Sequence, residues 1–114
     1  MSGSEPAAGP HFRPVPDIAE ALGVIVTKVH QLLRDRVIIG VRRAGVLMIP
    51  AEFVDDGEVV RGLSGTITVL TDAGFDDAEI IDWLFAPESG STAMAELTAG
   101  RVKGVHRRAQ VSGF

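Results

Sequence analysis

The chain has 114 residues, a net charge of −4 and no cysteine. This length suits one domain with a modest extension, and its core can form without disulfides or metals. The absence of cysteine excludes a disulfide scaffold, a thiolate zinc site and a cysteine nucleophile. The three histidines (His11, His30 and His106) share no metal-ligand spacing, so we predict no metal site.

Charge is distributed unevenly along the sequence. Residues 1–49 contain six Lys/Arg and four Asp/Glu, residues 50–100 contain one and eleven, and residues 101–114 contain four and none. This polarity suits a basic face for nucleic acid with an acidic body, although acidic surface is common in soluble proteins. No apolar run approaches the roughly 20 residues of a membrane span, and no signal peptide is visible. We therefore expect a cytoplasmic protein without a membrane partner.

Residues 1–14 are rich in Pro, Gly, Ala and Ser and offer little to bury. They predict a disordered N-terminal tail. His11 and Arg13 lie next to the folded part, where an arm can either touch a phosphate or remain solvated.

A first helix is predicted to begin at Pro16, because proline fits the first helical position. Its apolar face consists of Ile18, Ala19 and Leu22. Gly23 permits the positive φ that closes this helix and turns the chain.

A second helix is predicted over about 26–35. Four apolar residues at helical spacing are expected to point inward: Val26, Val29, Leu32 and Leu33. Lys28, Gln31 and Arg34 share the opposite face, with Thr27 and His30 beside them. Ile25 occupies the expected N-cap, where Ser or Asp is usual, so we expect water or a 3₁₀-type turn to compensate.

An apolar β-hairpin is predicted to follow, with a wing over about 39–49. Its first strand begins in the β-branched run 37–39 and its second strand covers 46–49. Arg42 and Arg43 precede a tight turn at Ala44-Gly45, and Pro50 ends the second strand. Residues 15–50 therefore predict a winged helix-turn-helix.

Residues 51–114 are predicted to form a helical region that packs on this domain. We expect a short turn at 51–54, a loop around 55–57 and a helix over 63–73. A capped helix from Asp76 that Pro87 ends, a linker at 88–92, and a last helix over 93–110 with a break near Gly100 are expected to follow. Trp83 is expected in the core. The basic closing segment either satisfies its own helix or supplies a second phosphate contact. The fold class is thus mainly α with a small β-hairpin wing.

In a helix-turn-helix the second helix enters the major groove of DNA. Gln31 can pair with adenine, and Arg34 or Lys28 with guanine. Thr27 is placed for a phosphate, while His30 can read a base or fill the groove-facing surface. Arg42 and Arg43 would reach the adjacent minor groove or its phosphates, although neighbours on a strand face opposite ways.

Four sequence blocks together carry a resemblance to a known family: LGVIVTKVHQLLRD, VRRAGVLMIP, LTDAGFDDAEIIDWLF and VHRRAQ. In this order they resemble a family of small actinobacterial winged helix-turn-helix DNA-binding proteins that are Ser/Thr-kinase substrates. The resemblance covers nearly everything from Val15 onward. It implies double-stranded DNA as the partner, no cofactor, and a recognition helix and wing that bear the residues named above. It also implies a phosphorylated N-terminal tail, which here contains Ser2 and Ser4 but no threonine.

Two other classes of function are compatible with a chain of this kind. A protein-interaction module without DNA binding would expose an apolar patch around the Trp83 helix. Paired acids at 55–56 and 76–77 lack an accompanying nucleophile or phosphate loop, so we predict no enzyme. A single helix-turn-helix reads only a few base pairs, which favours a dimer or tandem sites, but the sequence leaves the oligomeric state open.

Overall fold

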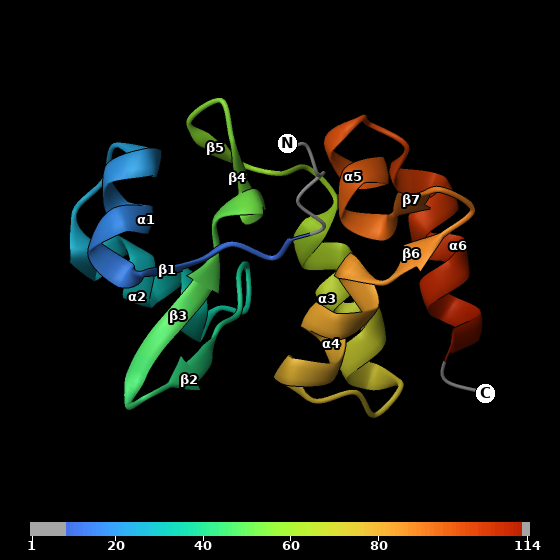
Figure 1. Cartoon of the computed structure of the whole chain (residues 1–114), viewed down its shortest axis with the longest axis horizontal. Coiled ribbons are helices and arrows are strands. Elements are labelled where there is room, and N and C mark those ends of the chain that lie inside the picture. Colours follow the sequence, from blue (N-terminus) through green and yellow to red (C-terminus); the bar gives the residue numbers. More distant parts are fainter. Residues whose placement is uncertain (1–8, 113–114) are drawn as a thin grey trace, which may run out of the picture.

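The computed structural model describes residues 9–112, which form two packed halves (Figure 1). The N-terminal half, residues 9–59, contains two α-helices, a three-stranded sheet, a 3₁₀ turn and a short hairpin. The C-terminal half, residues 60–112, contains four α-helices and a short hairpin. The predicted class, mainly α with a small β-wing, is confirmed. No helix in the described range is long and apolar enough to cross a membrane.

Helices α1 (Val15–Leu22) and α2 (Val26–Arg34) pack against each other across a tight turn. Helix α1 begins one residue before the predicted start, because Pro14 occupies the N-cap and Pro16 lies in the first turn. Gly23 ends it with φ of 70°, and the N–H of Val24 donates to the carbonyl of Ala19 at 3.0 Å. The predicted role of Gly23 is thus confirmed.

The sheet is antiparallel in the order β1-β3-β2, with strands β1 (Phe12–Pro14), β2 (Val41–Arg43) and β3 (Val46–Pro50). Strand β1 lies inside the segment predicted to be a disordered tail, so that prediction is wrong for residues 12–14. Phe12 pairs with Pro50 across the sheet. Pairing with strand β3, which is distant in the sequence, supplies the order that local composition does not indicate. Residues 1–8 lie outside the described range.

The first strand of the wing begins later than the sequence predicts. Residues 37–39 are not a strand, and strand β2 begins only at Val41. Ile38 and Ile39 are both buried. Successive residues of a strand face opposite sides, whereas this irregular segment places two neighbouring side chains in one core.

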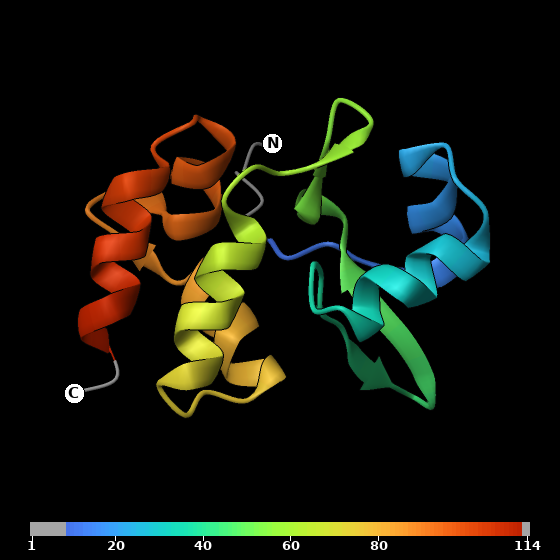
Figure 2. The same cartoon turned by 180° about the vertical axis from the view of Figure 1, so that it is seen from behind.

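After the sheet, the chain forms a 3₁₀ turn and one hairpin, then the helices and a second hairpin. The elements are η1 (Ala51–Phe53), β4 (Val54–Asp55), β5 (Glu58–Val59), α3 (Leu63–Asp72), α4 (Asp77–Phe85), β6 (Pro87–Glu88), β7 (Ser91–Thr92), α5 (Ala93–Thr98) and α6 (Val102–Ser112). Strands β4 and β5 contact α1, so the N-terminal half extends beyond residue 50. Seen from behind, α3 lies beside α6, which it contacts extensively (Figure 2).

The helices of the C-terminal half largely follow their predicted signals. A capping box begins α4: the N–H of Glu79 donates to Asp76 Oδ1 at 2.8 Å, and the N–H of Asp76 donates to Glu79 Oε1 at 2.9 Å. The last helix is broken near Gly100, as predicted. The predicted linker 88–92 instead contains most of the β6–β7 hairpin.

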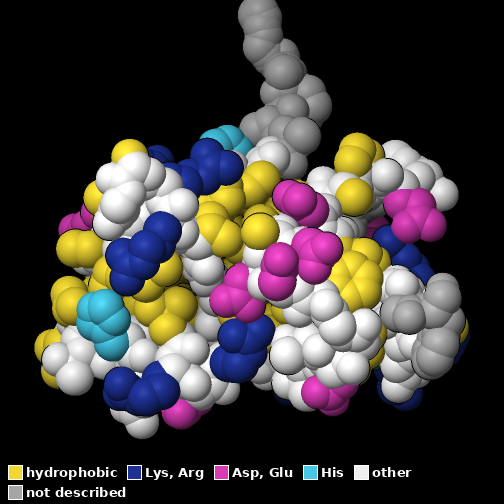
Figure 3. All heavy atoms as spheres, turned by 90° about the horizontal axis from the view of Figure 1, so that it is seen from below, with side chains coloured by type: hydrophobic (Ala, Val, Ile, Leu, Met, Phe, Trp, Pro, Cys, Tyr) yellow, Lys and Arg dark blue, Asp and Glu magenta, His cyan; other side chains and the backbone are white. Residues whose placement is uncertain are grey.

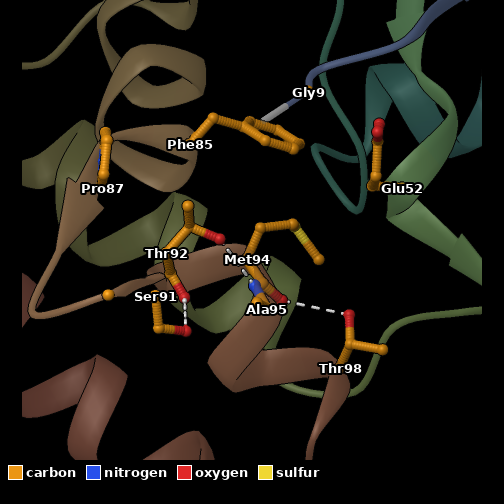
Figure 4. Close-up of a pocket in the computed structure, with 10 residues that line it drawn as sticks. Gly9, Glu52, Phe85, Pro87, Ser91, Thr92, Met94, Ala95 and Thr98 are labelled. Carbon is orange, nitrogen blue, oxygen red and sulfur yellow. Dashed lines mark hydrogen bonds between the residues drawn. The ribbon is translucent and has the colours of Figure 1, made fainter. Parts of the chain in front are cut away.

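Apolar side chains from both halves form one core. The rings of Phe53 and Phe85 stack across the junction with their centres 6.4 Å apart. Beside them lies a largely apolar pocket of about 470 Å³, bordered by Gly9 and Glu52 on one side and by α4, α5 and the β6–β7 hairpin on the other (Figure 4). The N-terminal half is therefore held against the C-terminal half by packing as well as by polar contacts.

Candidate nucleic-acid interface

The outer face of α2 carries the side chains predicted to contact DNA. All five are exposed: Thr27, Lys28, His30, Gln31 and Arg34. Residues of an α-helix are about 100° apart around its axis, and Val29, which is fully buried, marks the inner side. The outward direction is centred on Thr27, Gln31 and Arg34. The other two residues lie on the two flanks of this arc, so the sequence-predicted set forms one continuous surface.

The N-terminal end of α2 is more exposed than the sequence predicts. Val26 was expected to point inward but is 42% exposed. It lies about 60° from Val29 around the helix axis, at the margin of the buried face. Ile25 is the N-cap, makes no side-chain capping bond and is 72% exposed. The N–H of Lys28 donates to the carbonyl of Ile25 at 3.0 Å, which is the predicted 3₁₀-type compensation.

The two wing arginines lie on opposite faces of strand β2. Arg42 pairs with Leu47 and Arg43 with Val46 across the hairpin. The guanidinium carbon of Arg43 lies 4.2 Å from the centre of the Phe12 ring, a cation–π geometry that holds Arg43 on the sheet. Arg42 donates a long hydrogen bond of 3.4 Å to the carbonyl of Gly45 at the turn. The two residues are therefore not equivalent, and Arg42 has the less engaged guanidinium.

Most cations of the winged helix-turn-helix are available to a ligand. Within residues 9–112, Lys28, Arg34, Arg42 and Arg43 form no ion pair with an acidic side chain. On the face seen from below, Lys and Arg side chains are spread over the half formed by the winged helix-turn-helix, whereas Asp and Glu gather near the middle and on the other half (Figure 3). The uneven distribution of charge along the sequence thus corresponds to a separation of basic and acidic side chains on this face of the molecule.

Arg36 and His11 of the N-terminal half already have partners within the protein. Arg36 donates to Asp77 at 2.8 Å and to Thr71 at 3.0 Å in the C-terminal half. His11, considered as part of an arm for phosphate, contacts the carboxylate of Glu52 through its ring and its backbone N–H. These pairings leave no local signal in the sequence, because Thr71 is 35 residues from Arg36, and Asp77 and Glu52 are each 41 residues from their partners.

The basic end of the chain is partly neutralised within the C-terminal half. Arg101 binds Glu96, and together with a hydrogen bond from Ser91 it lowers the pKa of Glu96 to about 2. Arg108 binds Glu88 and lies over the ring of Trp83, 5.4 Å from its centre. These contacts favour the structural interpretation of the basic segment over a second phosphate contact.

Trp83 itself is not a core residue, contrary to the prediction. Its side chain is half-buried, and its Nε1–H donates to Ser112 Oγ at 3.0 Å. The indole nitrogen needs a hydrogen-bond partner, and the rim of the α4–α6 contact supplies one that a wholly apolar core would not.

Two adjacent helices with a three-residue turn, followed by a β-hairpin in a three-stranded sheet, define a winged helix-turn-helix protein. The model of the winged helix-turn-helix domain of the DNA-binding protein Rv2175c matches residues 8–54. A second model, the Rv2175c C-terminal domain of unknown function, matches residues 60–113. The chain belongs to the Rv2175c family.

Two individual comparisons agree with this assignment. The DNA-binding protein Rv2175c of Mycobacterium tuberculosis is 47% identical over 79 residues, which are 68% of this chain and 54% of that protein. The matched part thus spans about half the length of this curated relative. The NMR structure of Rv2175c has a TM-score of 0.82 and 35% identity, and the match covers 100% of this chain and 87% of that one.

Proposed function

We propose that this protein binds double-stranded DNA, with α2 in the major groove and the β2–β3 wing on the adjacent minor groove or its phosphates. The carrying observation is the exposed outer face of α2, which presents Thr27, Gln31 and Arg34 together on the same domain as the wing. Membership of a family named for a DNA-binding protein supports the same function.

The side chains have different tasks in this proposal. Gln31 suits adenine and Arg34 or Lys28 suits guanine, because these donors and acceptors match base edges in the major groove. Thr27, in the first turn of α2, suits a phosphate. Arg42 adds sequence-independent affinity through phosphates.

The exposed apolar patch expected of a protein-interaction module is not found on the Trp83 helix within residues 9–112. In the described part of the chain, no large hydrophobic residue of α4 is among the exposed ones. Arg108 and Ser112 cover the indole instead. We therefore propose a binding protein for DNA rather than for another protein, and a binding protein rather than an enzyme.

The test is a fluorescence-anisotropy titration of a random-sequence duplex at two salt concentrations. The double variant Arg42→Ala/Arg43→Ala should bind more weakly and with a flatter salt dependence, since each lost phosphate contact lowers the slope by about 0.9. The matched control is Lys103→Ala/Arg107→Ala, which removes two exposed cations of α6. Wild-type protein that binds no duplex even at low salt would refute the proposal, and equal losses in both variants would refute the wing assignment.

Three finer points extend this proposal. Regulation of transcription follows if the DNA bound lies near promoters, and a dimer or tandem sites would lengthen the sequence read. A Ser/Thr kinase is a further proposed partner. It would act on Ser2 or Ser4, which lie outside the described residues. A phosphate there would add up to two negative charges and weaken DNA binding. The variant Ser2→Asp/Ser4→Asp should therefore have a higher Kd for DNA than wild type.

A further inference from the structure

Three consecutive apolar side chains are exposed where the turn of the helix-turn-helix meets α2. Val24, Ile25 and Val26 are 36%, 72% and 42% exposed. In the described part of the chain only two other large hydrophobic residues are as open to solvent, Val46 in the wing and Val111 on α6. The cluster therefore forms a small apolar ridge beside the outer face of α2.

Folding does not account for isoleucine at position 25. The residue is the N-cap of α2, where Ser, Thr, Asp or Asn would accept a hydrogen bond from a free N–H of the first turn. Its backbone, with φ of −78° and ψ of 158°, is the extended conformation of an ordinary N-cap, so serine would fit without a backbone shift. Its side chain also buries little surface, so isoleucine brings neither a capping bond nor much hydrophobic stabilisation here.

We infer that Ile25, with Val26 beside it, is a specificity-determining residue that packs against thymine methyl groups in the major groove. This inference rests on the proposed DNA binding. In helix-turn-helix proteins the N-terminal residues of the second helix contact base edges. The C5-methyl of thymine is the apolar group among the base-edge features of the major groove, so an apolar side chain there favours thymine.

The surroundings of the ridge fit DNA better than a protein partner. Lys28 and Arg34 lie on the same helix, and neither forms an ion pair within residues 9–112. A polyanion therefore finds complementary charge next to the ridge. Three side chains are also a small surface compared with the roughly 800 Å² that each partner contributes to a standard protein interface. They suit contact with one or two methyl groups.

The experiment removes the thymine methyl and the isoleucine side chain separately. A pool of duplexes enriched by wild-type protein from a random library is copied once with dTTP and once with dUTP, which gives the same sequences without the C5-methyl. The Kd for both pools is measured for wild type, for Ile25→Ser and for Val111→Ser. The last variant is the matched control, because Val111 is 65% exposed on α6, in the other half of the protein.

Wild type and Val111→Ser should bind the thymine pool about fourfold more tightly for each methyl contacted, the ratio expected for burying one methyl group. Ile25→Ser should discriminate between the two pools less than wild type does, because only Val26 remains to contact a methyl group, and its Tm should not fall because serine is a better N-cap. The same thymine-to-uracil ratio in Ile25→Ser as in wild type would overturn the inference, as would a ratio of one in wild type. Wild-type protein that binds neither pool would instead refute the DNA-binding proposal and the inference together.

Discussion

The guanidinium of Arg36 is bonded to the carboxylate of Asp77, with 2.8 Å between Nη2 and Oδ1. The same nitrogen donates to Thr71 Oγ1 at 3.0 Å. Arg36 follows α2, whereas Thr71 lies near the end of α3 and Asp77 begins α4. One side chain thus connects the candidate recognition helix to the C-terminal half. Arg36 also has a positive φ of 58°, a conformation that costs a non-glycine residue about 1 kcal/mol or more.

Two substitutions of Arg36 separate its contacts from its backbone. Arg36→Ala should lower the free energy of unfolding by about 1 kcal/mol, because partly exposed ion pairs and single hydrogen bonds are each worth about that or less. Arg36→Gly loses the same contacts but relieves the positive φ, so it should be close to wild type. Urea unfolding measures both, with Arg61→Ala as the control, since exposed Arg61 forms no ion pair within residues 9–112. Equal losses in the two Arg36 variants would contradict the role assigned to its backbone.

The predictions that succeeded depend on signals within a few residues of one another. Gly23 turns the chain because its backbone alone tolerates φ of 70° there at little cost. The Asp76–Glu79 capping box is complete within four residues. The outer face of α2 follows from helical periodicity. Such signals place the helices and the candidate site without knowledge of the tertiary fold.

The predictions that failed depend on partners distant in sequence. Phe12 is ordered by pairing with Pro50 in the sheet. Trp83 donates a hydrogen bond to Ser112, which is 29 residues further along the chain. For the candidate site, the periodicity of α2 did not reveal that Val26 lies at an uncovered margin. The packing of Arg43 on Phe12 was equally invisible, because it requires a strand that composition had assigned to a tail.

The two wing arginines should behave differently when replaced singly. Arg43→Ala should lower the free energy of unfolding by about 0.5–1 kcal/mol, because it loses the cation–π contact with Phe12. Arg42→Ala should change stability by less than about 0.5 kcal/mol, as exposed surface substitutions do, but should lower the salt slope of DNA binding. Thermal unfolding measures the stability of Arg42→Ala and Arg43→Ala, each alone and combined with Phe12→Leu. A stability loss for Arg43→Ala that persists in the Phe12→Leu background would argue against the contact.

The ion pair of Glu96 should make a pH-dependent contribution to stability. Hydrogen bonds from Arg101 and Ser91 lower the pKa of Glu96 from 4.5 to about 2. A carboxylate with a lowered pKa in the folded state stabilises the fold above its unfolded pKa, and this contribution is lost as pH falls through the folded value. Glu96→Gln should therefore be less stable than wild type at pH 7, and the difference should shrink between pH 4.5 and 2. Urea unfolding across this range tests it beside Glu58→Gln, which removes an exposed carboxylate without an ion pair in the described residues. A gap independent of pH would contradict this role.

Two helical glycines should respond differently to replacement by alanine. A Cβ on Gly65 of α3 would lie 2.8 Å from His106 Cε1, and His106 is held in place by a 2.9 Å hydrogen bond to the carbonyl of Gly62. Overpacking of this kind costs about 1–3 kcal/mol, which exceeds or cancels the gain of about 1 kcal/mol from better helix propensity. Gly65→Ala should thus be neutral or destabilising.

A Cβ on Gly104 of α6 would meet no atom within 4 Å. Gly104→Ala should therefore raise the free energy of unfolding by about 0.5–1 kcal/mol, because only the propensity gain remains. Removing the ring with His106→Ala should make the Gly65→Ala change favourable in that background, since the steric conflict is then absent. Urea unfolding of the four variants measures these differences. If Gly65→Ala stabilises the wild-type protein as much as Gly104→Ala does, the close packing of α3 on α6 at His106 is wrong.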